Sequence, residues 1–144
     1  MKHHDARDRS ALGILLASTL LMGVASASAP GPTMAEMQWH RRVVILSTPR
    51  AGDAQCLAQE RALSQWRGGD DRDVSVVRIE HDAVSGSSET ATELRDRYHF
   101  AAATFSVALI GKDGHVVLRS QTALTGAQLD AVIDAMPMRR SGQR

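Results

Sequence analysis

Cysteine is almost absent from this sequence, because Cys56 is the single cysteine among 144 residues. One cysteine cannot form an internal disulfide, so the fold is expected to depend on its apolar core alone. The chain also lacks a Cys-x-x-Cys pair. Thiol–disulfide exchange within one motif needs an attacking thiol and a resolving thiol, so dithiol oxidoreductase chemistry is excluded.

An excess of charge of one sign is also missing. The chain has 17 Lys and Arg against 16 Asp and Glu, a net charge of +1. A near-neutral chain has no electrostatic footprint for nucleic acid or acidic lipid, so neither is expected as a partner. The histidines after residue 27 are scattered without metal-ligand spacing, so we expect no metal and no cofactor. They are His40, His81, His99 and His115.

No apolar run is long enough to span a bilayer, which takes about 20 residues. The uncharged run at residues 11–24 follows a segment with Lys2 and Arg7 and precedes Ala25-Ser26-Ala27. This order predicts a signal peptide over residues 1–27, cleaved after Ala27. The mature protein is therefore expected to be soluble and periplasmic or secreted, with no membrane span. Its expected parts are a flexible linker (28–37), one domain (38–140) and a tail (141–144).

Four short runs rich in Val and Ile predict strands, and they cover residues 42–47, 74–79, 105–110 and 116–120. Asp113-Gly114 lies between the last two runs and predicts a hairpin turn. Helical spacing follows Asp53, and Thr90-x-x-Glu93 and Thr125-x-x-Gln128 have the spacing of capping boxes. The predicted order is β-α-β-α-β-β-α. We expect a thioredoxin-like α/β fold with a mixed four-stranded sheet and helices on both faces.

Four motifs carry a resemblance to a known family. They are Trp39-x-x-Arg42, Arg72-Asp73, the hairpin sequence LIGKDG at 109–114, and IDAMPMR at 133–139. With them, residues 38 to about 140 resemble an uncharacterised thioredoxin-like family of exported bacterial proteins, a domain of unknown function. The resemblance implies a fold and export but no reaction.

Cys56 is the only candidate catalytic residue. Pro49-x-x-x-Asp53-x-x-Cys56 resembles the peroxiredoxin Pro-x-x-x-Thr-x-x-Cys loop. However, Asp53 occupies the position of the threonine, and its carboxylate would raise the pKa of the thiol. The arginine that this family places beside the later hairpin has no counterpart at residues 101–104. We therefore interpret Cys56 as a packing residue.

The predicted topology brings the family motifs to one end of the sheet, opposite the end where thioredoxins carry their active site. In one interpretation this end is a structural lock: Asp73 and Asp113 accept hydrogen bonds from Arg72 or Arg139, and Trp39 covers the core. In the other it is a docking surface for a protein or an anionic ligand. The residues concerned are Trp39, Arg72, Asp73, Lys112, Asp113, Met138, Arg139 and Arg140.

These observations predict a non-enzymatic binding or accessory module, whose partner is an unidentified protein or small ligand. The alternative is a single-cysteine thiol peroxidase or another thiol-redox protein that uses Cys56. A third possibility, a degenerate redox partner that only binds thiol oxidoreductases, has the same sequence features as the first. An exposed, reactive Cys56 would indicate the enzyme.

Overall fold

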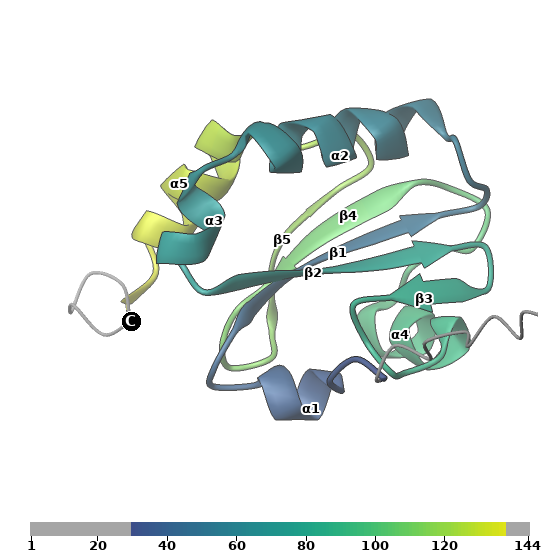
Figure 1. Ribbon diagram of the computed structural model, residues 1–144, viewed down its shortest axis with the longest axis horizontal. Helices are drawn as coiled ribbons and strands as arrows, with labels where there is room; N and C mark the ends of the chain where they lie inside the picture. Colours follow the sequence, from purple (N-terminus) through teal and green to yellow (C-terminus); the bar gives the residue numbers. More distant parts are fainter. Residues whose placement is uncertain (1–29, 138–144) are drawn as a thin grey trace, which may run out of the picture.

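The computed structural model describes residues 30–137. The predicted signal peptide at 1–27 and tail at 141–144 lie outside these residues. Residues 30–137 form a mixed α/β fold in which a five-stranded sheet is flanked by helices (Figure 1). The elements are α1 (Met34–Met37), β1 (Arg42–Thr48), α2 (Ala54–Gln65), α3 (Gly68–Asp71), β2 (Val74–Glu80), β3 (Ala83–Ser85), α4 (Ala91–Tyr98), β4 (Ser106–Ile110), β5 (Val116–Ser120) and α5 (Gly126–Asp134).

The strands are arranged in the order β3-β2-β1-β4-β5. β1 pairs in parallel with β2, with Arg42 opposite Val74 and Thr48 opposite Glu80. β4 runs antiparallel to both β1 and β5, so β4 and β5 form the predicted hairpin. All seven residues of the central strand β1 are buried. This burial explains why its sequence is a continuous apolar run rather than an alternating one.

Two apolar layers cover the sheet, because side chains alternate between its faces. Val43 and Ile45 pack with residues of α1 and α4. Val44 and Leu46 pack on the other face with residues of α2 and α5. Figure 1 shows α1 and α4 on one side of the sheet and α2, α3 and α5 on the other. Among the described residues, no helix has the length and hydrophobicity to cross a membrane.

The predicted helix starts are confirmed. Thr90 and Thr125 each cap a helix through a complete capping box, with Glu93 and Gln128 as the third helical residues. Asp53 caps α2, and its carboxylate accepts hydrogen bonds from the backbone N–H groups of Gln55 and Cys56. Each cap satisfies N–H groups that the helix itself leaves unpaired.

The expected number of strands is wrong, because the sheet has five and not four. The additional strand, β3, pairs antiparallel with the end of β2, from Arg78 opposite Ser85 to Glu80 opposite Ala83. It was missed because it has three residues and no apolar run, and sequence patterns become visible only over four or more residues. A left-handed backbone at His81, with φ of 52°, reverses the chain between the two strands.

The range expected to be a flexible linker, 28–37, contains α1. Thr33 and Glu36 form a capping box, and Met34 and Met37 are 6% and 3% exposed. The two methionines pack into the layer beneath α4. Four residues are too few to show helical periodicity, and for this reason the helix was not predicted.

Candidate functional site

Cys56 lies in the first turn of α2 and is 3% exposed. It belongs to the apolar layer that also contains Leu46 and Leu129. Burial raises the pKa of its thiol, and the carboxylates of Glu60, Glu80 and Asp53 raise it further, against a smaller lowering by Arg78. A reactive thiolate needs exposure and positive surroundings. The surroundings of Cys56 are therefore those of a neutral, packed thiol.

Three of the predicted site residues meet at the opposite end of the sheet. The backbone N–H of Trp39 donates to the carbonyl oxygen of Lys112 at 2.6 Å. The Lys112 ammonium lies 2.9 Å from Oδ2 of Asp73. These contacts join the segment before β1, the residue before β2 and the β4–β5 turn. We call the surface formed by Trp39, Arg72, Asp73, Lys112 and Asp113 the Trp39 pole.

The Lys112 ammonium is almost enclosed, since its side chain is 4% exposed, whereas that of Asp73 is 35% exposed. The hydrogen bond from Lys112 lowers the pKa of the Asp73 carboxyl, and the charges of Lys112, Arg41 and Arg42 contribute. A buried ammonium is tolerated only when it is paired. The carboxylate of Asp73 therefore stays ionised and supplies the counter-charge for the buried ammonium of Lys112.

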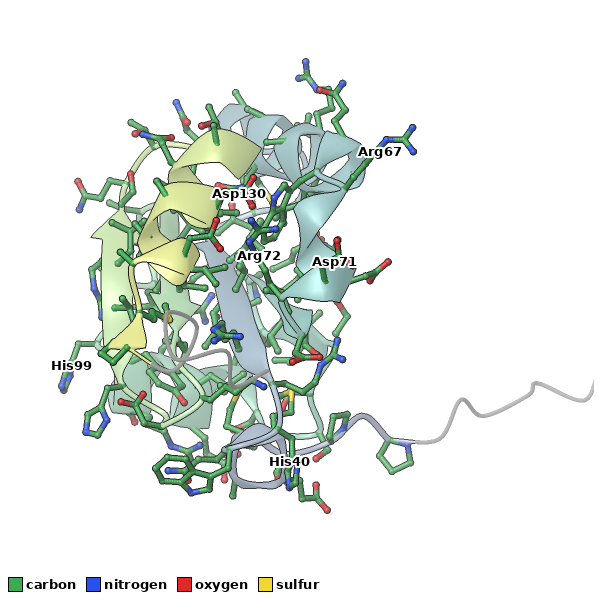
Figure 2. All side chains as sticks on the ribbon, turned by 90° about the vertical axis from the view of Figure 1, so that its left-hand side faces the viewer. His40, Arg67, Asp71, Arg72, His99 and Asp130 are labelled. Atoms are coloured by element: carbon green, nitrogen blue, oxygen red, sulfur yellow. The ribbon has the colours of Figure 1, made fainter. Side chains whose placement is uncertain are left out.

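Arg72 joins the start of β2 to α5. Its Nη2 atom lies 2.9 Å from Oδ2 of Asp134, and its Nε atom lies 3.2 Å from Oδ1 of Asp130. Nη1 also donates to the carbonyl oxygen of Gly68 at 3.3 Å. Figure 2 views this end of the molecule and shows Arg72 between α3 and α5, with Asp130 beside it. A planar guanidinium presents its five donors in a fixed fork, which suits it to several acceptors at set positions.

Arg42 is a further residue of this end that the sequence prediction left out of the site. It is 1% exposed, and its Nη1 atom donates to the carbonyl oxygen of Arg72 at 2.8 Å. Its Nε atom lies 3.4 Å from Sδ of Met136. The sequence did carry a signal, since a charged residue at the head of a continuous apolar strand must find buried partners.

Two expected details of the lock are corrected. Trp39 does not cover the core, because it is 62% exposed and its backbone is left-handed, with φ of 67°. Asp113 does not accept from an arginine among the described residues. Its Oδ1 atom accepts from the backbone N–H of His115 at 3.1 Å, and its Oδ2 atom lies 3.4 Å from Nδ1 of His115. This carboxylate closes its own turn, as Asp commonly does.

The remaining predicted residues, Met138, Arg139 and Arg140, lie outside the described part of the chain. Two hollows flank the β4–β5 turn near the Trp39 pole, and Asp113 lines both. One, of about 260 Å³, is lined by residues that include Arg42, Lys112 and Met136. The other, of about 370 Å³, lies between this turn and the helices α1 and α4.

Residues 33–142 match the model of Domain of unknown function (DUF4174), which covers every element from α1 to α5. No curated protein and no solved structure matches the chain.

Proposed function

The chain belongs to the family Domain of unknown function (DUF4174), and from this premise we propose that it is an exported, thioredoxin-like binding module without redox chemistry of its own. The sequence of residues 1–27 supports export to the periplasm or the exterior. The sheet supports the fold: β1 and β2 are parallel neighbours, and the β4–β5 hairpin lies on the other side of β1. This arrangement supports the proposal of a minimal thioredoxin-like sheet, to which β3 would add an edge strand.

The observation that carries the proposal is the display of Trp39. A non-glycine residue pays about 1–2 kcal/mol to adopt a left-handed backbone, and such strain persists where surrounding contacts enforce it. Here the enforcing contact is the 2.6 Å hydrogen bond from the Trp39 N–H to Lys112, which is itself fixed by Asp73. The result is an indole that is 62% exposed on an ordered support. Tryptophan is among the residues most enriched at binding hot spots.

The two interpretations of this end of the molecule therefore combine. Lys112, Asp73 and Arg72 form the lock, and Trp39 is the anchor that the lock presents. The hollows on either side of the β4–β5 turn are lined by other residues of this pole, Asp113 in both and Lys112 in one, and they would give a partner concave surface. The partner is proposed to be a protein, because an exposed indole with ordered polar neighbours suits a protein interface. A thiol oxidoreductase, the partner in the third interpretation of the sequence, would be one such protein.

The alternative, a thiol enzyme that uses Cys56, gains no support. Its thiol is buried in an apolar layer, and the nearest charged groups are mostly carboxylates. Both features disfavour the thiolate that attacks a peroxide or a disulfide.

The test is photo-crosslinking in cells that export the full chain. A photoreactive phenylalanine analogue replaces Trp39 in one variant and Leu57 in another. Leu57 is a matched control because it is also apolar and exposed, at 44%, but lies on α2 away from the pole. We expect a discrete protein adduct from position 39 and none from position 57. An adduct from position 57 alone would reject the Trp39 pole as the docking surface.

A further inference from the structure

A second cluster of functional side chains lies away from the Trp39 pole, where α2 passes the end of β2. Cys56 and Glu60 are four residues apart on α2 and so face the same way. Glu80 is the last residue of β2. The thiol sulfur and one carboxylate oxygen from each glutamate lie within 4.8 Å of one another. Cys56 is buried, and both glutamates are partly buried.

The carboxylates and the thiol of this cluster have too few positively charged or hydrogen-bonding partners. Arg78 donates from Nε to Oε1 of Glu60 at 3.0 Å, which leaves one cation beside two carboxylates. Among residues 30–137, no hydrogen bond or ion pair holds the Glu80 carboxylate or the Cys56 thiol, although the thiol is 3% exposed. Two neighbouring carboxylates that share one cation are an unfavourable group, and a bound cation would make it favourable. The same cation would convert the neutral thiol to a thiolate ligand and release its proton to solvent.

We propose that Cys56, Glu60 and Glu80 bind a divalent cation of the zinc class, with a fourth position open to water. The donor set determines the class of ion. A thiolate excludes Mg²⁺ and Ca²⁺, which take oxygen ligands, whereas zinc accepts sulfur and carboxylate oxygen together. Three protein ligands and one water complete a tetrahedron.

The geometry is compatible with this ion after small movements. Zinc–sulfur and zinc–oxygen distances of about 2.3 and 2.1 Å in a tetrahedron place ligand atoms about 3.5 Å apart. The atoms of the cluster lie within 4.8 Å, so closure requires about 1 Å, which rotation of two partly exposed glutamates supplies.

Arg78 then serves as an outer partner of the site. It bonds one oxygen of Glu60 and leaves the other for the ion, as second-shell donors do for ligating carboxylates. The ion and Arg78 together carry three positive charges, which balance the thiolate and the two carboxylates. This site lies on other elements than the Trp39 pole, so it neither requires nor supports the binding proposal. Its direct effect is to fasten α2 to the end of β2.

The test uses the full chain after treatment with EDTA, titrated with Co²⁺. We expect a sulfur-to-cobalt charge-transfer band that saturates at one ion per chain. Because Cys56 is the only cysteine, this band reports no other residue. Zn²⁺ should displace Co²⁺, which removes the band, and should raise the Tm of the protein. The absence of the band in the folded wild-type chain would overturn the proposal without the need for any variant.

The variants assign the carboxylates. Glu60→Gln and Glu80→Gln should each weaken Co²⁺ binding at least tenfold, whereas Asp96→Asn, on the exposed surface of α4, should leave it unchanged. Cys56→Ser should abolish the band and most of the rise in Tm with Zn²⁺. A band that persists undiminished in both glutamine variants would overturn the site, and so would an equal rise in Tm in Cys56→Ser. Circular dichroism confirms that each variant is folded.

Discussion

The ammonium of Lys112 and the carboxylate of Asp73 lie 2.9 Å apart, although 39 residues separate them in the sequence. The pair links the β4–β5 turn to the start of β2, and Lys112 in turn accepts from the backbone of Trp39. The side chain of Lys112 is 4% exposed and that of Asp73 is 35% exposed, so Lys112 depends on the ion pair more than Asp73 does. Asp73 can be solvated without its partner, whereas Lys112 cannot.

We expect Asp73→Asn to destabilise the protein by about 1–3 kcal/mol, because it leaves a buried ammonium without a counter-charge. Asparagine tolerates the left-handed backbone of Asp73, with φ of 53°, so the substitution isolates the charge. Urea unfolding measures the change. Lys112→Met removes the ammonium and keeps the apolar stem. The double variant that combines Asp73→Asn with Lys112→Met should therefore be more stable than Asp73→Asn alone. A double variant that is less stable than both single variants would contradict this account.

The same pair predicts how stability depends on pH. The pKa of Asp73 is lowered in the folded protein, so its contribution is fully present above the ordinary Asp value of about 3.9. It is lost as the pH falls below that value toward the lowered one, because the proton then binds more readily to the unfolded chain. The difference in stability between wild type and Asp73→Asn should be constant from about pH 5 to 8 and shrink below it. A difference that grows on acidification would show that the charge pair is not its source.

Trp39 provides a third prediction, because its exposed side chain and its strained backbone both indicate that replacing it by glycine costs little stability. Glycine adopts φ of 67° without strain, and the indole that it removes is 62% exposed. Trp39→Gly should therefore change stability by no more than about 1 kcal/mol, whereas a core tryptophan costs about 3–5 kcal/mol on truncation. Trp66 is the control, since it packs against a core layer and its Nε1 atom donates to Asp130 at 2.8 Å. Equal losses for Trp39→Gly and Trp66→Ala would remove the basis for a displayed anchor.

Most of the fold could be predicted because its signals are local. The continuous apolar run of β1 and the capping residues Thr90 and Thr125 identify elements within a few residues of sequence. The short elements α1 and β3 could not be predicted, because three or four residues show no period. They form where longer elements supply partners. β3 pairs with β2, and the two methionines of α1 pack into the apolar layer between the sheet and α4.

The position of the candidate site could be predicted from the sequence, but the pairing of its charged side chains could not. Topology alone indicates that Trp39, Asp73 and Lys112 lie at one end of the sheet. Which cation meets which carboxylate depends on side-chain length and burial. The sequence prediction named Arg72 or Arg139 for Asp73, whereas among the described residues, which do not include Arg139, the partner of Asp73 is Lys112. The cluster of Cys56, Glu60 and Glu80 was missed for a related reason. Its residues come from a helix and a strand, so no spacing within one segment of the sequence predicts that they meet.

Cys56 provides a fourth prediction, which rests on burial alone. In the folded structure the thiol is 3% exposed, so reagent reaches it only when α2 opens, and EDTA treatment removes any ion that would also block it. Alkylation by iodoacetamide should therefore be at least about 100-fold slower in the folded protein than in urea, which mass spectrometry follows at fixed pH. Equal rates in the two conditions would restore the thiol-enzyme interpretation.

Two glycines with the same kind of backbone give the last prediction. Gly86 and Gly52 have φ of +83° and +76°, so alanine is strained at both. They differ in space: a Cβ at Gly86 would lie 2.2 Å from the carbonyl oxygen of Val76, whereas a Cβ at Gly52 would meet nothing within 4 Å. Gly52→Ala should lower the free energy of unfolding by about 1 kcal/mol, because it introduces backbone strain alone.

Gly86→Ala should cost clearly more, about 3 kcal/mol or above, because the segment after β3 must leave its position against β2. Urea unfolding of the two variants under one set of conditions makes the comparison, and their difference isolates the steric contact from the shared strain. Equal losses would mean that the chain after β3 relaxes at little cost. In that case β3, the strand that the sequence did not predict, would be a loosely held edge of the sheet.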